Sequence, residues 1–139
     1  MKKRLSVSVN LMVEFFDLDP MDVVWHGNYP RYFEKARSEL LNIIGYNYGE
    51  MKLSGYSWPV VDFRIKYIKP LRLHQKIIVN AELVEYENRL KIEYVIYDEI
   101  SNEVLTKAYS IQVAVNISNN ALAFVTPDHF QNKIRKLLL

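Results

Sequence analysis

The sequence predicts an α+β fold in which one antiparallel sheet of about five strands wraps a single long helix, with a short helix at the C-terminus. Apolar and polar residues alternate with a period of two in several segments, which is typical of half-buried strands. One segment instead repeats its apolar residues at helical spacing, and polar turn residues separate the last strands. With 139 residues and 50% hydrophobic composition, residues 1–139 fit one globular domain.

The first strand and the long helix occupy the N-terminal part of the chain. We expect a strand from Leu5 to Phe15, because apolar residues fill every second position there. A helix follows, with Asn28 as its N-cap, Pro30 in its first turn and Gly45 as its stop. Its apolar stripe consists of Phe33, Ala36, Leu40, Ile43 and Ile44. This stripe is too apolar to face water, so the sheet has to cover it.

Four strands and a short helix are predicted for the rest of the chain. The first of these strands starts at Val61 and ends before Pro70, which cannot continue a strand ladder. The other strand-like runs are Ile77 to Val84, Leu90 to Tyr97 and Val104 to Val115. Hairpin signals at Glu87-Asn88 and Ser101-Asn102 separate them and predict an antiparallel meander. The final helix is capped by Thr126-Pro127-Asp128 and carries Phe130, Ile134 and Leu137.

The composition excludes several classes of function. A formal charge of +2 is too small for a nucleic-acid-binding protein. The absence of cysteine excludes disulfides, a thiolate nucleophile and cysteine-ligated zinc, and the three histidines lack the spacing of a helical zinc motif. We therefore expect no metal and no cofactor. No apolar stretch is long enough for a membrane span, and the charged start is followed by alternation instead of an apolar block, so we expect no signal peptide and a cytoplasmic protein.

Aromatic residues are more numerous than a small monomer needs. Ten tyrosines and six phenylalanines suggest an oligomer interface as well as a ligand pocket. The alternative, that tyrosines only cover solvated strand faces, stays open.

An acidic turn between the first strand and the long helix is the best candidate for chemistry. Asp17, Asp19 and Asp22 precede His26, just before the predicted helix start. Carboxylates there lie beside unpaired backbone N–H groups, which can polarise a carbonyl oxygen. An acid or base beside such a site suggests acyl transfer, although Asp19-Pro20 taken alone also fits an ordinary turn.

The segments around this turn resemble one known family. They are Asp17-Leu18-Asp19-Pro20, Val23-Val24-Trp25-His26-Gly27-Asn28-Tyr29, Tyr32-Phe33-Glu34 and Ala36-Arg37. Together they resemble the 4-hydroxybenzoyl-CoA thioesterase family, including its branch associated with the Tol-Pal system, over residues 5–125. The resemblance implies the hotdog fold, an acyl-CoA thioesterase that acts on an acyl-CoA substrate, and a homo-oligomer, either a dimer or a tetramer made of two dimers.

The resemblance also implies roles for individual residues. Asp19 matches the catalytic carboxylate, which attacks the thioester carbonyl or activates a water molecule. His26 matches a histidine of the Tol-Pal-associated branch, whose backbone N–H helps to polarise the thioester oxygen. Tyr29 matches the motif as a supporting residue. The remaining substrate-binding candidates implied by the family are Trp58, Pro59, Val60 and Arg89, the last as a contact to the nucleotide phosphates.

Asp22 departs from the family pattern, because family members commonly have glycine at this position. Glycine often marks a positive φ, which aspartate tolerates less well, and a third carboxylate adds like charge near Asp19. This substitution keeps a non-catalytic acyl-ligand binding module open as an alternative. A thioesterase for acyl carrier protein esters is the second alternative.

Overall fold

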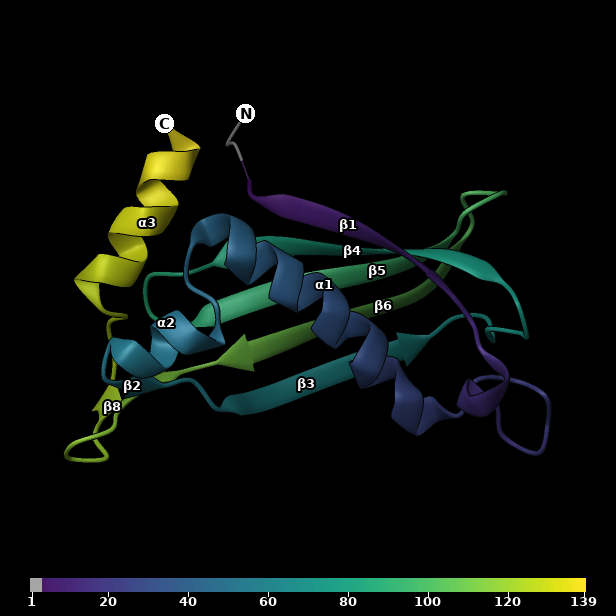
Figure 1. Cartoon of the computed structure of the whole chain (residues 1–139), viewed down its shortest axis with the longest axis horizontal. Helices are drawn as coiled ribbons and strands as arrows, with labels where there is room; N and C mark the ends of the chain where they lie inside the picture. Colours follow the sequence, from purple (N-terminus) through teal and green to yellow (C-terminus); the bar gives the residue numbers. More distant parts are fainter. Residues whose placement is uncertain (1–3) are drawn as a thin grey trace.

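One antiparallel sheet and one long helix make up most of the molecule (Figure 1). The computed structural model describes residues 4–139, so residues 1–3 of the charged start lie outside the described residues. The elements in chain order are β1 (Ser6–Met12), η1 (Phe15–Asp17), η2 (His26–Asn28), α1 (Tyr29–Ile44), α2 (Tyr48–Leu53), β2 (Tyr56–Ser57), β3 (Val60–Tyr67), β4 (Lys76–Glu85), β5 (Leu90–Asp98), β6 (Val104–Gln112), β7 (Ala114–Asn116), β8 (Leu122–Ala123) and α3 (Asp128–Leu138). The predicted α+β architecture is confirmed.

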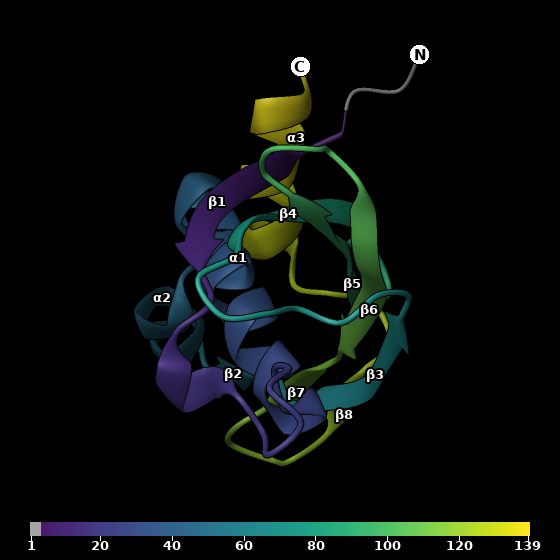
Figure 2. The same cartoon turned by 90° about the vertical axis from the view of Figure 1, so that its right-hand side faces the viewer.

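The large sheet has five strands in the order β1-β4-β5-β6-β3, and all neighbouring pairs are antiparallel. β1 and β3 form its two edges, and the sheet curves around α1 between them (Figure 2). The short strands β2, β7 and β8 form a second sheet. Within residues 4–139, β3 pairs only with β6, so its other side presents backbone groups that a further strand could pair with.

The helix α1 begins and ends as the sequence predicts. Pro30 lies in its first turn, and Gly45 has the left-handed conformation (φ 81°) that ends it. The predicted capping role of Asn28 is wrong, because its side chain makes no cap hydrogen bond. A short 3₁₀ turn precedes the helix, so the backbone of Asn28 is already helical (φ −88°, ψ −14°) and its Nδ2 donates to Asp17 O instead, at 2.8 Å.

The buried stripe of α1 differs from the predicted stripe at one position. Phe33, Ala36 and Leu40 are fully buried, whereas Ile43 is 53% exposed. Leu41 and Ile44, three residues apart, also face the core, which turns Ile43 away from the sheet. The prediction for Ile43 was therefore wrong.

Two predicted strands are longer than the observed ones. β1 ends at Met12 instead of Phe15, because the chain turns into the 3₁₀ segment η1, where Asp17 Oδ2 accepts the backbone N–H of Glu14 at 2.9 Å. The run from Val104 to Val115 divides near Val113 into β6 of the large sheet and β7 of the small sheet. The elements α2, β2 and β8 are too short to leave a periodic pattern in the sequence.

The C-terminal helix α3 closes the end of the core away from the start of α1 (Figure 1). Phe130 and Ile134 are fully buried, and the Phe130 ring lies 4.8 Å from the Trp58 ring. Thr126 does not cap this helix, because its hydroxyl donates to Tyr86 O at 2.6 Å. Among the described residues, no helix has the length and apolar character needed to cross a bilayer. The cytoplasmic location stays a prediction.

Candidate active site

The acidic turn is a tight hairpin whose corner is formed by Asp19. The Asp19 backbone N–H donates to Val23 O at 2.8 Å, and the Asp22 N–H donates to Asp19 O at 3.1 Å. Pro20 follows Asp19 and supplies the fixed φ that the second position of such a turn favours. Asp19 Oδ1 accepts the Met21 N–H at 2.8 Å. The carboxylate is thereby held in one orientation by its own turn, with Oδ2 free of described hydrogen bonds.

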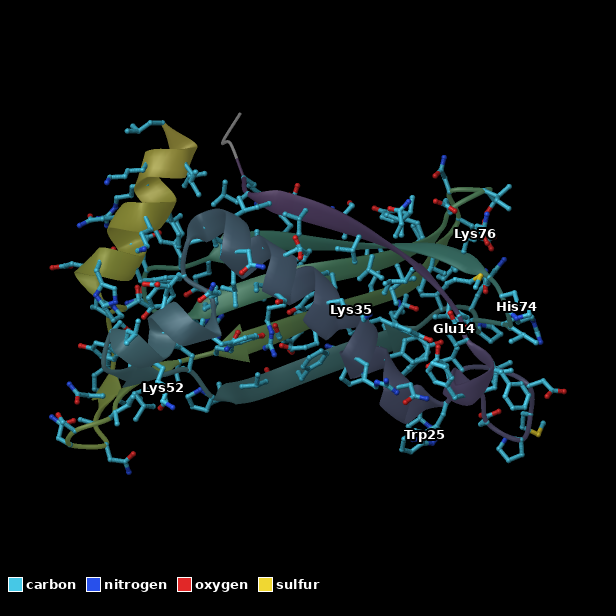
Figure 3. The ribbon with its side chains drawn as sticks, in the orientation of Figure 1. Glu14, Trp25, Lys35, Lys52, His74 and Lys76 are labelled. Carbon is cyan, nitrogen blue, oxygen red and sulfur yellow. The ribbon has the colours of Figure 1, made fainter. Side chains whose placement is uncertain are left out.

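Hydrogen bonds fix this hairpin against the start of α1. The carbonyl oxygen of Asp17 accepts the Trp25 backbone N–H at 3.0 Å and the Asn28 side-chain amide at 2.8 Å. The Tyr67 hydroxyl, at the end of β3, donates to His26 O at 3.1 Å. Trp25 lies at this end of α1 (Figure 3). The acidic turn, the 3₁₀ turn η2 and the end of β3 therefore meet at the helix N-terminus.

Two adjacent backbone amides at the helix start are free to bind an oxygen atom. The Asn28 N–H donates to Trp25 O at 2.9 Å, but no hydrogen bond from the N–H of His26 or Gly27 is found within residues 4–139. Both residues are exposed, and both lie at the positive end of the α1 dipole. The Trp25 indole lies over Gly27, where a Cβ atom would come within 2.4 Å of Trp25 Cζ3, so a side chain at this position would displace the indole. The arrangement can polarise a carbonyl oxygen.

Asp17 is the most deeply buried carboxylate of the turn, which the sequence did not indicate. It is 5% exposed, and its Oδ2 accepts the Tyr32 hydroxyl and the Glu14 N–H, both at 2.9 Å. Burial and the bond to this carboxylate raise the pKa of Tyr32, which keeps the hydroxyl protonated as a donor. A cavity of about 380 Å³ opens beside this pair and is also lined by Arg31 and Lys35. Asp17 thus anchors the turn to α1.

The predicted site residues form two groups at opposite ends of β3. Asp19, His26 and Tyr29 lie at the helix start, where the Tyr29 ring is 4.7 Å from that of Tyr67, the last residue of β3. The first residue of β3, Val60, lies about 23 Å away along the strand. The second group consists of Trp58, Pro59, Val60 and Arg89.

The second group lies at the end of the sheet that carries α2 and α3. Val60 and Leu90, the neighbour of Arg89, both align with Gln112 of β6. Trp58 is buried, with its Nε1 donating to the Tyr46 hydroxyl at 3.2 Å. Arg89 pairs with Glu85 at 2.8 Å. One copy of the chain therefore does not bring these residues to Asp19.

A comparison with known families decides the class of this protein. A family model described as the thioesterase-like superfamily matches residues 13–134. The chain belongs to the thioesterase-like superfamily. The predicted hydrolase class, a thioester hydrolase, and the hotdog fold are both confirmed at this level.

Several proteins named as thioesterases are similar to this chain. It is 31% identical over 105 residues to a Bacillus subtilis protein named "Putative acyl-CoA thioesterase YneP", and the match covers 75% of each chain. It is 29% identical over 106 residues to the acyl-acyl carrier protein thioesterase ATL3 of Arabidopsis thaliana, covering 76% of this chain and 56% of that one. The 1,4-dihydroxy-2-naphthoyl-CoA thioesterase from Synechocystis has the same fold, with a TM-score of 0.84, 19% identity and coverage of 95% and 97%.

The backbone at Asp22 has a conformation that favours glycine. Asp22 has a φ of 62°, in the left-handed region that glycine adopts without strain. It follows the hairpin corner as an extra residue before Val23, and hairpins of this kind favour glycine at that position. The positive φ suggested by the departure from the family pattern is confirmed.

Replacing Asp22 by glycine is expected to stabilise the protein. The variant Asp22→Gly should raise the free energy of unfolding by up to about 1 kcal/mol, because relief of the left-handed strain exceeds the extra freedom of glycine in the unfolded chain. Urea denaturation measures the change. Met21→Gly is the matched control, since Met21 has no positive φ and should lose stability. If both variants lost the same free energy of unfolding, the backbone at Asp22 would not be strained.

Proposed function

We propose that this protein hydrolyses acyl-CoA thioesters at the acidic turn, with Asp19 as the catalytic carboxylate. The observation that carries the proposal is that the hairpin containing Asp19 is hydrogen-bonded, through Asp17 O, to Trp25 and Asn28 on either side of the free N–H groups of His26 and Gly27. A carboxylate beside preorganised amide donors is the combination that thioester hydrolysis requires.

In the proposed reaction, the thioester oxygen accepts hydrogen bonds from the N–H groups of His26 and Gly27. The Asp19 carboxylate then either attacks the carbonyl carbon or removes a proton from an attacking water molecule. A new C–O bond forms, the C–S bond breaks, and the CoA sulfur leaves and acquires a proton. In the general-base route, the proton that Asp19 takes from water passes to the thiolate. In the nucleophilic route, attack by the carboxylate gives an anhydride and the thiolate takes its proton from solvent. One water molecule then hydrolyses the anhydride, which releases the acid and regenerates the Asp19 carboxylate. The His26 side chain supports this step next to the leaving sulfur.

A thioester panel tests the proposed function. Purified protein should release free thiol from acyl-CoA esters at enzyme concentrations where mock-purified protein does not. The same acyl groups on acyl carrier protein test the second candidate, which the similarity to the Arabidopsis acyl carrier protein thioesterase favours. Ligand binding without turnover of any ester would support a binding module and overturn the hydrolase proposal.

We further propose that two copies of the chain pair through the free edges of β3. The strand exposes Val60 and Val61 at its start and Tyr67 at its end, and its outer side is unpaired within residues 4–139. Antiparallel pairing about a two-fold axis would bring the start of one β3 beside the end of the other. The second group of predicted residues, including Val60 and Arg89, would then meet Asp19 of the other copy. A tetramer of two such dimers, and membership of the Tol-Pal-associated branch, are finer proposals from the sequence motif.

Mixing two defective variants tests a site shared between copies. Asp19→Asn removes the catalytic carboxylate, and Arg89→Ala should reduce turnover about tenfold at low acyl-CoA concentration by losing a phosphate contact. After unfolding and refolding together, equal amounts should recover about a quarter of the wild-type activity, because each mixed dimer contains one intact site. The two variants refolded separately and then combined are the control. Activity no higher than this control would contradict the shared site.

A further inference from the structure

The His26 and Gly27 amides at the helix start belong to peptide groups whose carbonyl oxygens are both hydrogen-bonded. The His26 N–H shares its peptide group with Trp25 O, which accepts the Asn28 N–H at 2.9 Å. The Gly27 N–H shares its peptide group with His26 O, which accepts the Tyr67 hydroxyl at 3.1 Å. A trans peptide group is planar, so a bond that fixes the direction of its C=O also fixes its N–H, which points the opposite way. The direction of the Gly27 N–H therefore depends on Tyr67.

The sequence leaves His26 O open to a side-chain donor. In an α-helix this oxygen would accept the N–H of the residue four positions later. That residue is Pro30, which has no N–H. Tyr67 supplies the hydroxyl from the end of β3, 41 residues away in the sequence. The hydrogen bond thus ties the start of α1 to the edge strand of the large sheet.

The Tyr67 side chain is held in the position that this hydrogen bond requires. Its ring packs edge-on against the buried Tyr29 ring, with the centroids 4.7 Å apart. Its backbone pairs with Thr106 of β6, and the N–H of the next residue, Ile68, donates to Leu105 O at 3.1 Å. Burial raises the pKa of Tyr67, so the hydroxyl keeps its proton at neutral pH. Tyr67 is therefore a fixed hydrogen-bond donor.

The segment after β3 also holds the acidic turn. The Val24 N–H donates to Leu71 O at 2.9 Å, just beyond the hairpin of Asp19. Leu71 is fully buried and follows Tyr67 by four residues. One short stretch of chain thus supports both the arm that carries the proposed catalytic carboxylate and the peptide group that carries the Gly27 N–H.

Building on the proposed function, we infer that Tyr67 is a positioning residue for the oxyanion site, because its hydroxyl orients and polarises the peptide group between His26 and Gly27. A hydrogen bond to a carbonyl oxygen makes the N–H of the same peptide group a stronger donor, since bonded amides polarise one another. The benefit is largest when negative charge develops on the thioester oxygen. Tyr67 acts through the Gly27 N–H and touches no reacting atom.

The variant Tyr67→Phe tests this role, because it removes only the hydroxyl and keeps the ring that packs on Tyr29. We expect kcat for a hydrolysed acyl-CoA to fall about tenfold, with KM within about twofold of the wild-type value. Thiol release measures both constants. Tyr109→Phe is the matched control, because it also removes a strand hydroxyl, which donates to Asp62 Oδ2 at 3.2 Å between β6 and β3. Its kcat should stay within about twofold of the wild type.

The infrared spectrum of a bound ester separates polarisation from a general structural effect. In the Asp19→Asn background, an acyl-CoA with an isotope label at the thioester carbonyl should stay intact while its spectrum is recorded. Hydrogen bonds to the carbonyl oxygen lower its stretching frequency. Adding Tyr67→Phe should therefore raise the frequency, whereas adding Tyr109→Phe should leave it unchanged.

The outcomes separate this inference from the proposed function. Equal kcat values for Tyr67→Phe and Tyr109→Phe would overturn the positioning role while the thioesterase proposal stands. A fall in kcat with a changed oligomeric state and an unchanged carbonyl frequency would show that Tyr67 acts through the pairing of β3, and would also overturn it. No release of thiol from any acyl-CoA by the wild-type protein would instead contradict the proposed function.

Discussion

The variant Asp19→Asn should lose about a thousandfold in kcat for any acyl-CoA that the wild-type protein hydrolyses. Asparagine has nearly the same shape, and its Oδ1 can still accept the Met21 N–H that holds the corner of the hairpin. It cannot act as a base or as a carboxylate nucleophile. The loss should therefore appear in kcat, with the far-UV spectrum and the free energy of unfolding close to those of the wild type. Thiol release measures the rate.

The neighbouring substitution Asp22→Asn is the matched control for Asp19. It also removes one negative charge from the turn, and asparagine adopts a positive φ at least as readily as aspartate. Its rate should stay within about threefold of the wild type, because the described hydrogen bonds give the Asp22 side chain no partner. If Asp22→Asn lost as much activity as Asp19→Asn, the general charge of the turn would matter and Asp19 would have no special role.

The variant Phe33→Ala should lower the free energy of unfolding by about 3–5 kcal/mol. Phe33, in the second turn of α1, is fully buried, and its ring packs on those of Tyr94 and Phe63 from two strands of the sheet. Removing the ring opens a cavity between helix and sheet that rigid neighbours cannot fill. The loss is a large share of the about 5–15 kcal/mol typical of a domain. Urea denaturation with an unchanged slope gives the difference.

Ile43→Ala is the control from the same helix. Ile43 is 53% exposed, so its truncation should change the free energy of unfolding by less than about 0.5 kcal/mol. A loss at Ile43 comparable to that at Phe33 would mean that another surface covers this side of α1 in solution.

The regular elements of the fold could be predicted because their patterns depend on local spacing. Alternation along β4 and β5 and the stripe through Phe33, Ala36 and Leu40 report directly which side faces the core. The predictions are wrong where contacts between residues distant in the sequence determine where a strand ends. β1 ends early because Asp17 folds back on Glu14, and the last long strand divides near Val113 because its partner changes from β3 at Val60 to β2 at Ser57.

The candidate site was predicted less completely than the fold, because carboxylates close in sequence differ in their surroundings. Asp17 is the buried carboxylate of the turn because it accepts a hydrogen bond from Tyr32 on α1. The sequence of the turn itself does not indicate this hydrogen bond. Arg37 did leave a signal, since it lies four residues after Phe33 and three before Leu40, within the buried stripe. A charged residue at a core position predicts a partner of opposite charge, which in this structure is Glu34.

The separation of the two residue groups along β3 has a consequence for any assay of this protein. If each active site combines residues from opposite ends of β3 in two copies of the chain, a single chain contains only half of an active site. The fraction of complete active sites then depends on the association equilibrium of the two copies. Specific activity per chain should then fall as the enzyme is diluted below the dissociation constant of the pair. Rates measured at very low enzyme concentration would report association equilibrium as well as chemistry.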